Sequence, residues 1–164
     1  MGALQDICGW TRASFDKQYK PEQIGFLLGT VGTNGKVVVT RAALYKGGVR
    51  TMWGVTFDTA GMHVARRNAA RKARLRALGL FHSHVEIAGR AEYGLSGDDR
   101  ESFAEDEDAL VEAVVAVRAA DRVPVRTWRK VLFGFDREDG YAYNIRVYGK
   151  TPRGVRLLPI EASK

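Results

Sequence analysis

The spacing of apolar residues changes several times along the chain between a helical period and a strand period. Helical spacing, or a composition rich in alanine and arginine, predicts helices at residues 4–19, 62–78 and 99–118. Apolar segments bounded by glycine, proline and turn residues predict strands at residues 24–31, 36–40, 50–57, 79–84, 123–135 and 141–148. Helices and strands alternate first, and strands then pair locally. The pattern therefore predicts an α/β fold, a single domain with a mixed β-sheet packed by helices.

Two turn signals and one apolar face refine this assignment. Residues 33–35 (Thr-Asn-Gly) predict a tight hairpin between the first two strands, and residues 138–140 (Glu-Asp-Gly) predict another between the last two. In the segment 99–118, the apolar residues that share one helical face are Phe103, Leu110, Val114 and Val117. Their spacing is the reason for predicting a helix there.

The composition is that of a globular protein without disulfides. The 164 residues are 45% hydrophobic and 27% charged, with a net charge of +7, which fits one domain spanning residues 1–164. No apolar run has membrane-spanning length and no secretion signal is evident, so we expect a cytoplasmic protein without a membrane partner. Cys8 is the only cysteine. Zinc sites with two thiolates are therefore excluded, and we expect Cys8 to be a small buried residue.

Two of the three histidines, His82 and His84, lie two positions apart. On a strand, residues at this spacing project from the same face, so the two imidazoles are able to bind one zinc ion. A catalytic zinc site usually has three protein ligands and a fourth position for water. Asp99 is the natural third ligand, because it begins a predicted helix and the loop at 85–95 is able to bring it back beside the strand.

Each part of this pattern also has a structural interpretation. Ser96 followed by Asp99 is typical of a capping box at a helix N-terminus. A His-x-His pair also occurs on surfaces, or in cores where it bonds to the backbone. Two enzyme classes with related motifs are excluded. An amidohydrolase barrel needs about 250 residues, and a zinc deaminase built on His84-Val85-Glu86 would need two cysteines.

An acidic residue upstream completes the groups that a zinc hydrolase needs. Such an enzyme requires a general base near the reactive water, and Glu22 comes just before the apolar strand at 24–31. Gly25 and Gly29 on that strand would let another backbone or a substrate chain approach closely. The alternative is that Glu22 is an exposed acid at the start of a strand.

Together these segments resemble the motif of the JAMM (MPN+) metalloprotease family. The family pattern is Glu-x-x-Gly-x-x-x-Gly, then His-x-His, then Ser-x-x-Asp, and residues 22–29, 82–84 and 96–99 match it in that order. The match covers roughly the first two-thirds of the chain. Two features depart from the family: Val85 stands where proline is usual, and the loop that follows is longer.

The resemblance implies a fold, a cofactor and a role for each matched residue. The fold would be the JAMM/MPN architecture, which is similar to that of cytidine deaminases. One Zn2+ per chain would be bound by His82, His84 and Asp99. Glu22 would take a proton from a water molecule and pass it to the leaving amine. Ser96 would either hydrogen-bond the oxyanion or orient the aspartate.

The resemblance also implies a substrate class. Members of the family often cleave the bond after the C-terminal glycines of ubiquitin or a ubiquitin-like protein. We therefore expect a deubiquitinase-like isopeptidase or peptidase of the compact prokaryotic kind, acting in deconjugation or precursor processing. Its partners would be a ubiquitin-like protein with a Gly-Gly tail, its conjugates, and the ubiquitin-like conjugation enzymes of the same pathway.

Two other functions remain open at this point. The basic residues of the segment 66–76 are Arg66, Arg67, Arg71, Lys72, Arg74 and Arg76. Such a segment would suit nucleic acid, but few aromatic residues interleave it, so we expect a solvated helix or a surface for an acidic protein. The acidic run at 98–108 would be solvated, or would pair with this helix. A non-catalytic scaffold of the same fold is the second alternative, and bound metal distinguishes it.

Overall fold

The computed structural model describes residues 2–51, 54–86, 92–120, 130–136 and 140–161. Within these ranges the helices are α1 (Ala3–Phe15), α2 (Thr59–Ala73) and α3 (Gly97–Glu105). The strands are β1 (Ile24–Val31), β2 (Val37–Leu44), β3 (Val49–Thr51), β4 (Gly54–Thr56), β5 (Arg76–Val85), β6 (Val111–Ala119), β7 (Leu132–Asp136), β8 (Tyr141–Thr151) and β9 (Gly154–Leu157). None of the described helices is long and apolar enough to cross a membrane.

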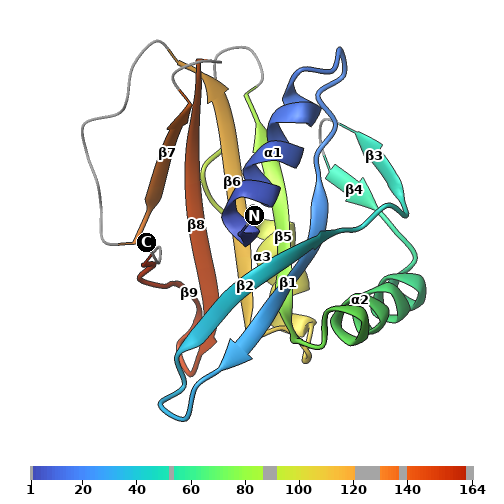
Figure 1. Ribbon diagram of the computed structural model, residues 1–164, viewed down its shortest axis with the longest axis vertical. Helices are drawn as coiled ribbons and strands as arrows, with labels where there is room; N and C mark the ends of the chain where they lie inside the picture. Colours follow the sequence, from blue (N-terminus) through green and yellow to red (C-terminus); the bar gives the residue numbers. More distant parts are fainter. Residues whose placement is uncertain (1, 52–53, 87–91, 121–129, 137–139, 162–164) are drawn as a thin grey trace.

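One curled, mixed sheet organises the molecule. Its strand order is β2-β1-β5-β6-β8-β7, with β9 also paired to β8, and β3 and β4 form a separate small hairpin. β5 and β6 run parallel, whereas the other neighbours in the large sheet are antiparallel. In Figure 1, α1 crosses the front of the sheet, α3 lies behind it, and α2 lies beside the lower part of β1. The predicted fold, a single α/β domain with a mixed sheet packed by helices, is confirmed.

The central strands are buried on both faces. On one face, Ile7 of α1 packs in a cluster with Leu27 and Phe81, and Trp10 stacks on Phe81 with ring centroids 5.9 Å apart. On the other face, Met62 of α2 packs in a cluster that includes Phe26. α3 packs on this second face as well, through Phe103. Strands covered on both sides carry continuous apolar runs instead of alternation, which is the pattern of β1, β5 and β6.

The predicted helix at 62–78 is wrong at its C-terminal end. α2 ends at Ala73, and Arg74 caps it in the left-handed conformation with φ of 55°. β5 then begins at Arg76, earlier than the predicted strand at 79–84. Left-handed caps are usually glycine or asparagine, so an arginine at this position gave no stop signal.

The predicted helix at 99–118 is wrong from residue 106 onward. α3 ends at Glu105, and Val111–Ala119 is strand β6, paired to β5 on one side and β8 on the other. The segment combines apolar residues at helical spacing with a run of β-branched valines. Burial on both faces favours the strand, because valine is stiff at χ1 and packs well in a pleated sheet.

The remaining strands follow the predictions in part. The hairpin turn at 33–35 joins β1 to β2, with Gly35 at a φ of 77°. The predicted strand at 50–57 is two short strands, β3 and β4. Residues 123–129 of another predicted strand, and residues 138–139 of the second turn, lie outside the described residues, but β7 and β8 do pair antiparallel. The sequence did not predict β9.

The glycines of β1 accommodate the chain's own neighbouring strand. A Cβ atom at Gly25 would overlap the carbonyl oxygen of Ala43 and the ring of Phe81, and one at Gly29 would overlap the carbonyl oxygen of Val38. The pairing of β1 with β2 shifts register beside Gly29. The expected close approach is therefore made by β2.

Strand β2 lies at one end of the sheet and carries exposed side chains. Val38 and Val39 are 41% and 37% exposed, and Lys36 and Arg41 beside them are also exposed. β2 thus presents apolar side chains between two cations.

Gly79 is the position where the sheet tolerates a side chain least. Its φ is 155°, and a Cβ atom there would overlap the backbone carbonyl oxygen of Val111 on the parallel neighbour β6. We expect Gly79→Ala to lower the free energy of unfolding by about 3 kcal/mol, measured by urea denaturation. Gly9→Ala is the matched control, because a Cβ atom at Gly9 meets nothing within 4 Å, and it should stabilise the helix by about 0.5–1 kcal/mol. Equal stability of the two variants would contradict the β5–β6 pairing.

Candidate metal centre

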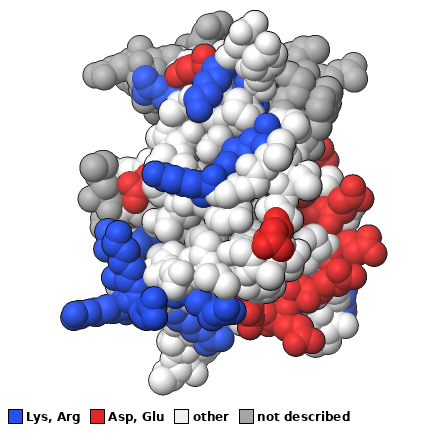
Figure 2. All heavy atoms as spheres, turned by 90° about the vertical axis from the view of Figure 1, so that its right-hand side faces the viewer, with Lys and Arg blue, Asp and Glu red and all other residues white. Residues whose placement is uncertain are grey.

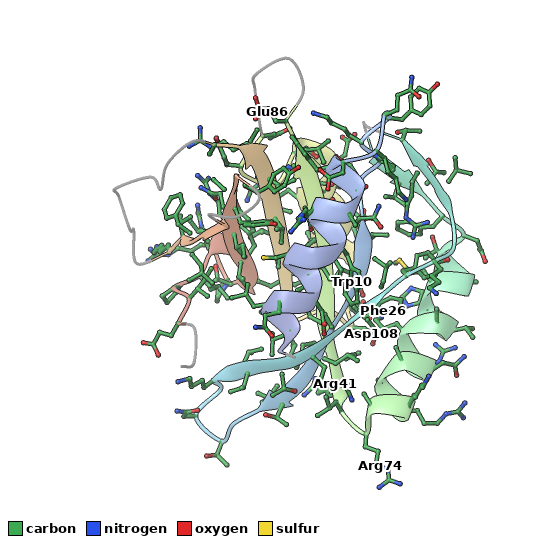
Figure 3. The ribbon with its side chains drawn as sticks, turned by 45° about the horizontal axis from the view of Figure 1, so that its top comes forward. Trp10, Phe26, Arg41, Arg74, Glu86 and Asp108 are labelled. Atoms are coloured by element: carbon green, nitrogen blue, oxygen red, sulfur yellow. The ribbon has the colours of Figure 1, made fainter. Side chains whose placement is uncertain are left out.

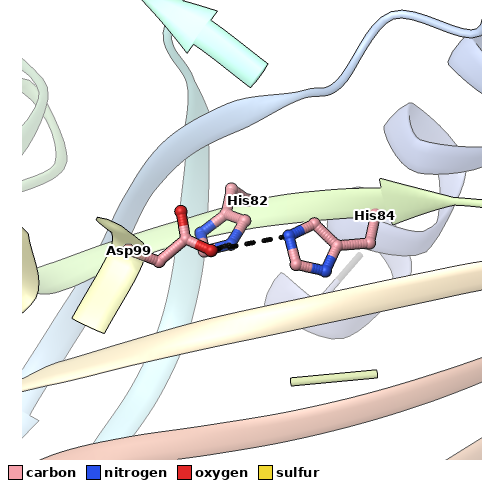
Figure 4. Close-up of side chains that lie close together, drawn as sticks. All are labelled: His82, His84 and Asp99. Carbon is pink, nitrogen blue, oxygen red and sulfur yellow. Dashed lines mark ion pairs between the residues drawn. The ribbon is translucent and has the colours of Figure 1, made fainter. Parts of the chain in front are cut away.

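Side chains from two separate segments of the predicted motif converge at one place on the sheet. His82 and His84 project from the same face of β5 and are buried, and Asp99 lies in the first turn of α3. Their possible ligand atoms all lie within 4.8 Å of one another. Asp99 Oδ2 is 3.5 Å from His82 Nε2 and 3.7 Å from His84 Nε2 (Figure 4). The three residues form a group able to hold a metal ion.

The outer nitrogens of both histidines have acceptors behind them. His82 Nδ1 lies 3.0 Å from Glu112 Oε1, and His84 Nδ1 lies 3.1 Å from the backbone carbonyl oxygen of Glu92. Because both partners are acceptors, Nδ1 carries the proton in each ring and Nε2 faces inward. Metal-binding histidines have this arrangement, in which the outer N–H bond fixes the ring and its tautomer.

The inner surface of this group fits a cation. His82 Nε2 is buried and makes no hydrogen bond with the described residues. Ligands about 2.0–2.1 Å from a tetrahedral zinc ion lie about 3.3–3.4 Å from one another. The distances of 3.5 Å and 3.7 Å from Asp99 Oδ2 to the two Nε2 atoms are close to that separation. Small movements of the side chains would therefore bring all three atoms onto one ion.

Ser96 and Asp99 form a capping box and also belong to the site. The Ser96 N–H and hydroxyl donate to Asp99 Oδ2 at 2.9 Å and 2.7 Å, and the Asp99 N–H donates to Ser96 Oγ at 3.1 Å. Asp99 Oδ2 is the same oxygen that faces the histidines. The motif therefore serves both as a helix cap and as part of the candidate metal site. The Ser96 hydroxyl holds the Asp99 carboxylate in its orientation.

Glu22 lies beside the three clustered residues. Ile24 pairs with His82, and the Ser83 N–H donates to the Gln23 carbonyl oxygen at 2.8 Å. Continuing this antiparallel register places Glu22 opposite His84, on the same face. Among the described residues its carboxylate makes no hydrogen bond or ion pair. Burial raises the pKa of Glu22 to about 7, although the two nearby histidines oppose this shift. A carboxyl group with a pKa near neutrality suits a general base.

The charges of the cluster depend on one another. Burial disfavours the charged form of His82, but the adjacent Asp99 and Glu112 carboxylates outweigh it and raise the pKa of His82 to about 10. Burial also opposes ionisation of Asp99, yet His82 and His84 hold its pKa well below the usual range. Without a metal ion, the Asp99 carboxylate therefore faces a protonated His82, and a cation bound here would replace that proton.

Sequence reasoning missed two groups that support the histidines. Glu112 is 6% exposed and lies on β6, two residues before the partner of His82 in the parallel pairing. A single acid inside the apolar run 109–117 was the available signal, because a buried carboxylate needs a partner. The other group is the backbone carbonyl of Glu92, which has no sequence signal at all.

The basic helix pairs with the acidic run at one residue. Arg66 is 2% exposed and donates to Asp106 at 2.6 Å and to Asp108 at 3.3 Å. The other basic residues of the segment are exposed, and Arg74 points away from the molecule in Figure 3. Figure 2 shows basic side chains at the lower left of this face and acidic ones at the lower right. A nucleic acid lying on the basic region would therefore meet repulsion beside it.

Cys8 is half-buried against the α1 face of the core. Burial raises the pKa of its thiol to about 12. The thiolate, which is the nucleophilic form, is therefore suppressed at neutral pH. This fits the expected structural role.

No protein-family model matches this chain, and no curated protein matches it.

Glu112 gives a direct test of the arrangement behind His82. Glu112→Gln keeps the shape of the side chain but removes the charge, so we expect the affinity for zinc to fall by about tenfold to a hundredfold. Competition with a chromogenic chelator measures this affinity. Glu101→Gln, on the exposed side of α3, is the control and should leave it unchanged. An unchanged affinity in Glu112→Gln would remove this residue from the site.

Glu22 should make the metal-free protein less stable at alkaline pH. Its pKa is raised from 4.5 to about 7 in the fold, so the folded state favours the protonated form. The associated stability is present below pH 4.5 and is lost as the pH rises through about 7. We expect Glu22→Gln to raise the melting temperature more at about pH 8.5 than at about pH 4.5 in the presence of chelator. An equal effect at both values would show that Glu22 is solvated.

Proposed function

We propose that this chain is a zinc-dependent peptidase or isopeptidase of the JAMM (MPN+) type. The observation that carries the proposal is the convergence of His82, His84 and Asp99 on one buried point, with Glu22 beside them. The resemblance of the motif residues assigned these same four side chains to a hydrolytic site. Their arrangement supports that assignment because each has the neighbours that its role requires.

Zinc is the ion that the donor set and spacing favour. Two imidazole nitrogens and one carboxylate are typical of catalytic zinc, whereas magnesium and calcium prefer oxygen donors throughout. Some iron oxygenases use the same three residue types. In an octahedral site with bonds of about 2.1 Å, adjacent donors would lie about 3.0 Å apart. The separations of 3.5 Å and 3.7 Å are nearer to the tetrahedral value.

Each residue of the site has a separate role in the proposed hydrolysis. A zinc ion bound here would supply Lewis acidity, which polarises the scissile carbonyl and lowers the pKa of water. The Glu22 carboxylate accepts a proton from the attacking water and then donates it to the departing amine nitrogen. Ser96 holds the Asp99 carboxylate in place. Glu112 and the Glu92 carbonyl hold the imidazole rings.

The proposed substrate is a ubiquitin-like protein, cleaved after its C-terminal glycines. This choice rests on the motif resemblance. A glycine tail is narrow and extended, so it is able to bind beside a strand through main-chain hydrogen bonds. Its conjugates, and the conjugation enzymes of the same pathway, are the proposed partners.

Metal content and cleavage together test the proposal. We expect the purified chain, dialysed without chelator, to retain about one zinc ion, and His82→Ala to retain far less. We expect the wild type to cleave a linear fusion of a Gly-Gly-ended ubiquitin-like protein to a reporter, with chelator abolishing cleavage. Glu22→Gln should retain zinc but cleave about a hundredfold or more slowly, because a general base contributes that much.

Two outcomes would overturn this proposal. If the wild type neither retains zinc nor takes it up, the histidines are a structural pair. A non-catalytic scaffold then becomes the better-supported function. If Glu22→Gln cleaves as fast as the wild type, Glu22 is not the base. Glu101→Gln controls for a general effect of removing an acid near the site.

A further inference from the structure

A cleft opens on the same face of the sheet as the metal centre. It has a volume of about 270 Å³ and lies over β6, β8 and β7. The side chains that give it its chemistry are Tyr93, Arg118, Val131, Phe133, Asn144 and Arg146. No residue of the zinc hydrolase motif lies in it, so its role is separate from the metal group itself.

The pairing register places this cleft close to the metal centre. His82 pairs with Val114 on β6, and Val114 pairs with Arg146 on β8. His84 is related to Asn144 in the same way, through Ala116. Neighbouring strands are about 4.8 Å apart, so each histidine and its counterpart on β8 are separated by about 10 Å along the sheet. That is the length of about three residues of extended peptide.

Two cations in the cleft have no acidic partner among the described residues. Arg118 and Arg146 are both half-buried. Among the described residues, Arg118 makes no ion pair or hydrogen bond, and Arg146 Nε donates only to Asn144 Oδ1, at 3.3 Å. Partly desolvated charges are stabilised by a partner of opposite sign. The cleft is therefore prepared for an anion, and the Asn144 amide nitrogen offers it a further donor.

The walls and the volume of the cleft limit the size and the chemical type of the anion that fits. Tyr93, Val131 and Phe133 give an apolar surround, and the Tyr93 ring lies 5.8 Å from the Arg146 guanidinium. Clefts for drug-sized ligands start at about 300 Å³. A cleft of about 270 Å³ fits one acidic residue better than a nucleotide. Guanidinium groups bind planar carboxylates in a two-pronged geometry.

One short segment connects the cleft with the metal centre. The Glu92 carbonyl accepts from His84 Nδ1, and the next residue, Tyr93, lines the cleft. Gly94 follows, and a Cβ atom there would lie 3.0 Å from the Tyr148 hydroxyl and 3.8 Å from Arg146 Nη1. Residues 92–94 therefore form a common wall, with a metal ligand on one side and the arginine cleft on the other.

We propose that this cleft binds a carboxylate of the polypeptide substrate, about three residues from the bond that is cleaved. The proposal rests on the proposed peptidase function, which makes a polypeptide the ligand. The carboxylate belongs either to an acidic side chain or to a chain terminus, since both have the same chemistry. Arg118 and Arg146 hold it, and they give the enzyme a preference for acidic sequence near the cleavage point.

Peptide binding to the full-length protein tests this proposal without relying on cleavage. The probes are acetyl-Gly-Gly-Ala-Ala-Glu-amide, acetyl-Gly-Gly-Ala-Ala-Gln with a free carboxyl terminus, and acetyl-Gly-Gly-Ala-Ala-Gln-amide, which has no carboxylate. Titrations are followed by amide NMR of the labelled chain. We expect at least one carboxylate peptide to bind about tenfold more tightly than the neutral one, and to shift the Asn144 side-chain amide. The two acidic peptides distinguish a side-chain carboxylate from a terminal one.

Arginine variants assign the binding to the cleft. The double variant Arg118→Gln/Arg146→Gln should bind all three peptides equally, whereas Arg153→Gln, in an exposed turn, should keep the preference. The single variants Arg118→Lys and Arg146→Lys retain the charge without the two-pronged geometry, and each should lose part of the preference. They keep the test valid if the double variant does not fold, which its amide spectrum reveals.

The outcomes separate this proposal from the proposed function. Equal binding of the three peptides to the wild type, or a preference that survives in the arginine variants, overturns the carboxylate site. A preference that depends on the arginines supports it, even if no ubiquitin-like fusion is cleaved. In that case the ubiquitin-like substrate is rejected, whereas the carboxylate-binding site is retained.

Discussion

The parallel pairing of β5 with β6 is the constraint on which the rest of the molecule depends. Parallel neighbours need a crossover that leaves one end of the sheet and returns to the other. Here the crossover includes α3, which lies behind the sheet in Figure 1. Asp99 in its first turn lies 3.5 Å from His82 and 3.7 Å from His84. The same register brings Glu112 behind His82. One backbone arrangement thus supplies a candidate metal ligand from the crossover and a supporting carboxylate from the adjacent strand.

The charged groups of the centre hold one another in place. Asp99 Oδ2 accepts from Ser96 while it faces both histidines, so the helix cap and the candidate ligand are one structure. Glu22 differs, since nothing described bonds to its carboxylate and burial raises its pKa. The chain therefore combines a firmly held group of candidate metal ligands with an acid that is free to exchange protons. Such a division is typical of sites where stability has been given up for reactivity.

The sequence predicted the local features well and the long-range ones poorly. The strand at 24–31 and the shared face of His82 and His84 follow from turn signals and from a period of two, and both agree with the structure. The sequence predicts a helix over β6 because Leu110, Val114 and Val117 fall at helical spacing, and because valines buried on both faces show no alternation. Glu112 was missed for the same reason, as its role appears only when β6 lies beside β5. The arginine cleft likewise needs three strands in register.

The exposed edge at β2 has a consequence for how copies of this protein behave in a crowded solution. An edge strand presents unpaired N–H and C=O groups, and exposed valines there would invite a second molecule to extend the sheet. Lys36 and Arg41 stand beside Val38 and Val39. Lys36 also lies 3.7 Å from the exposed carboxylate of Glu161, so Arg41 carries most of the uncompensated charge at this edge. When two identical edges approach, repulsion between these cations opposes the formation of backbone bonds. These two side chains thus serve as gatekeepers against aggregation, and their protection weakens as salt screens their charge.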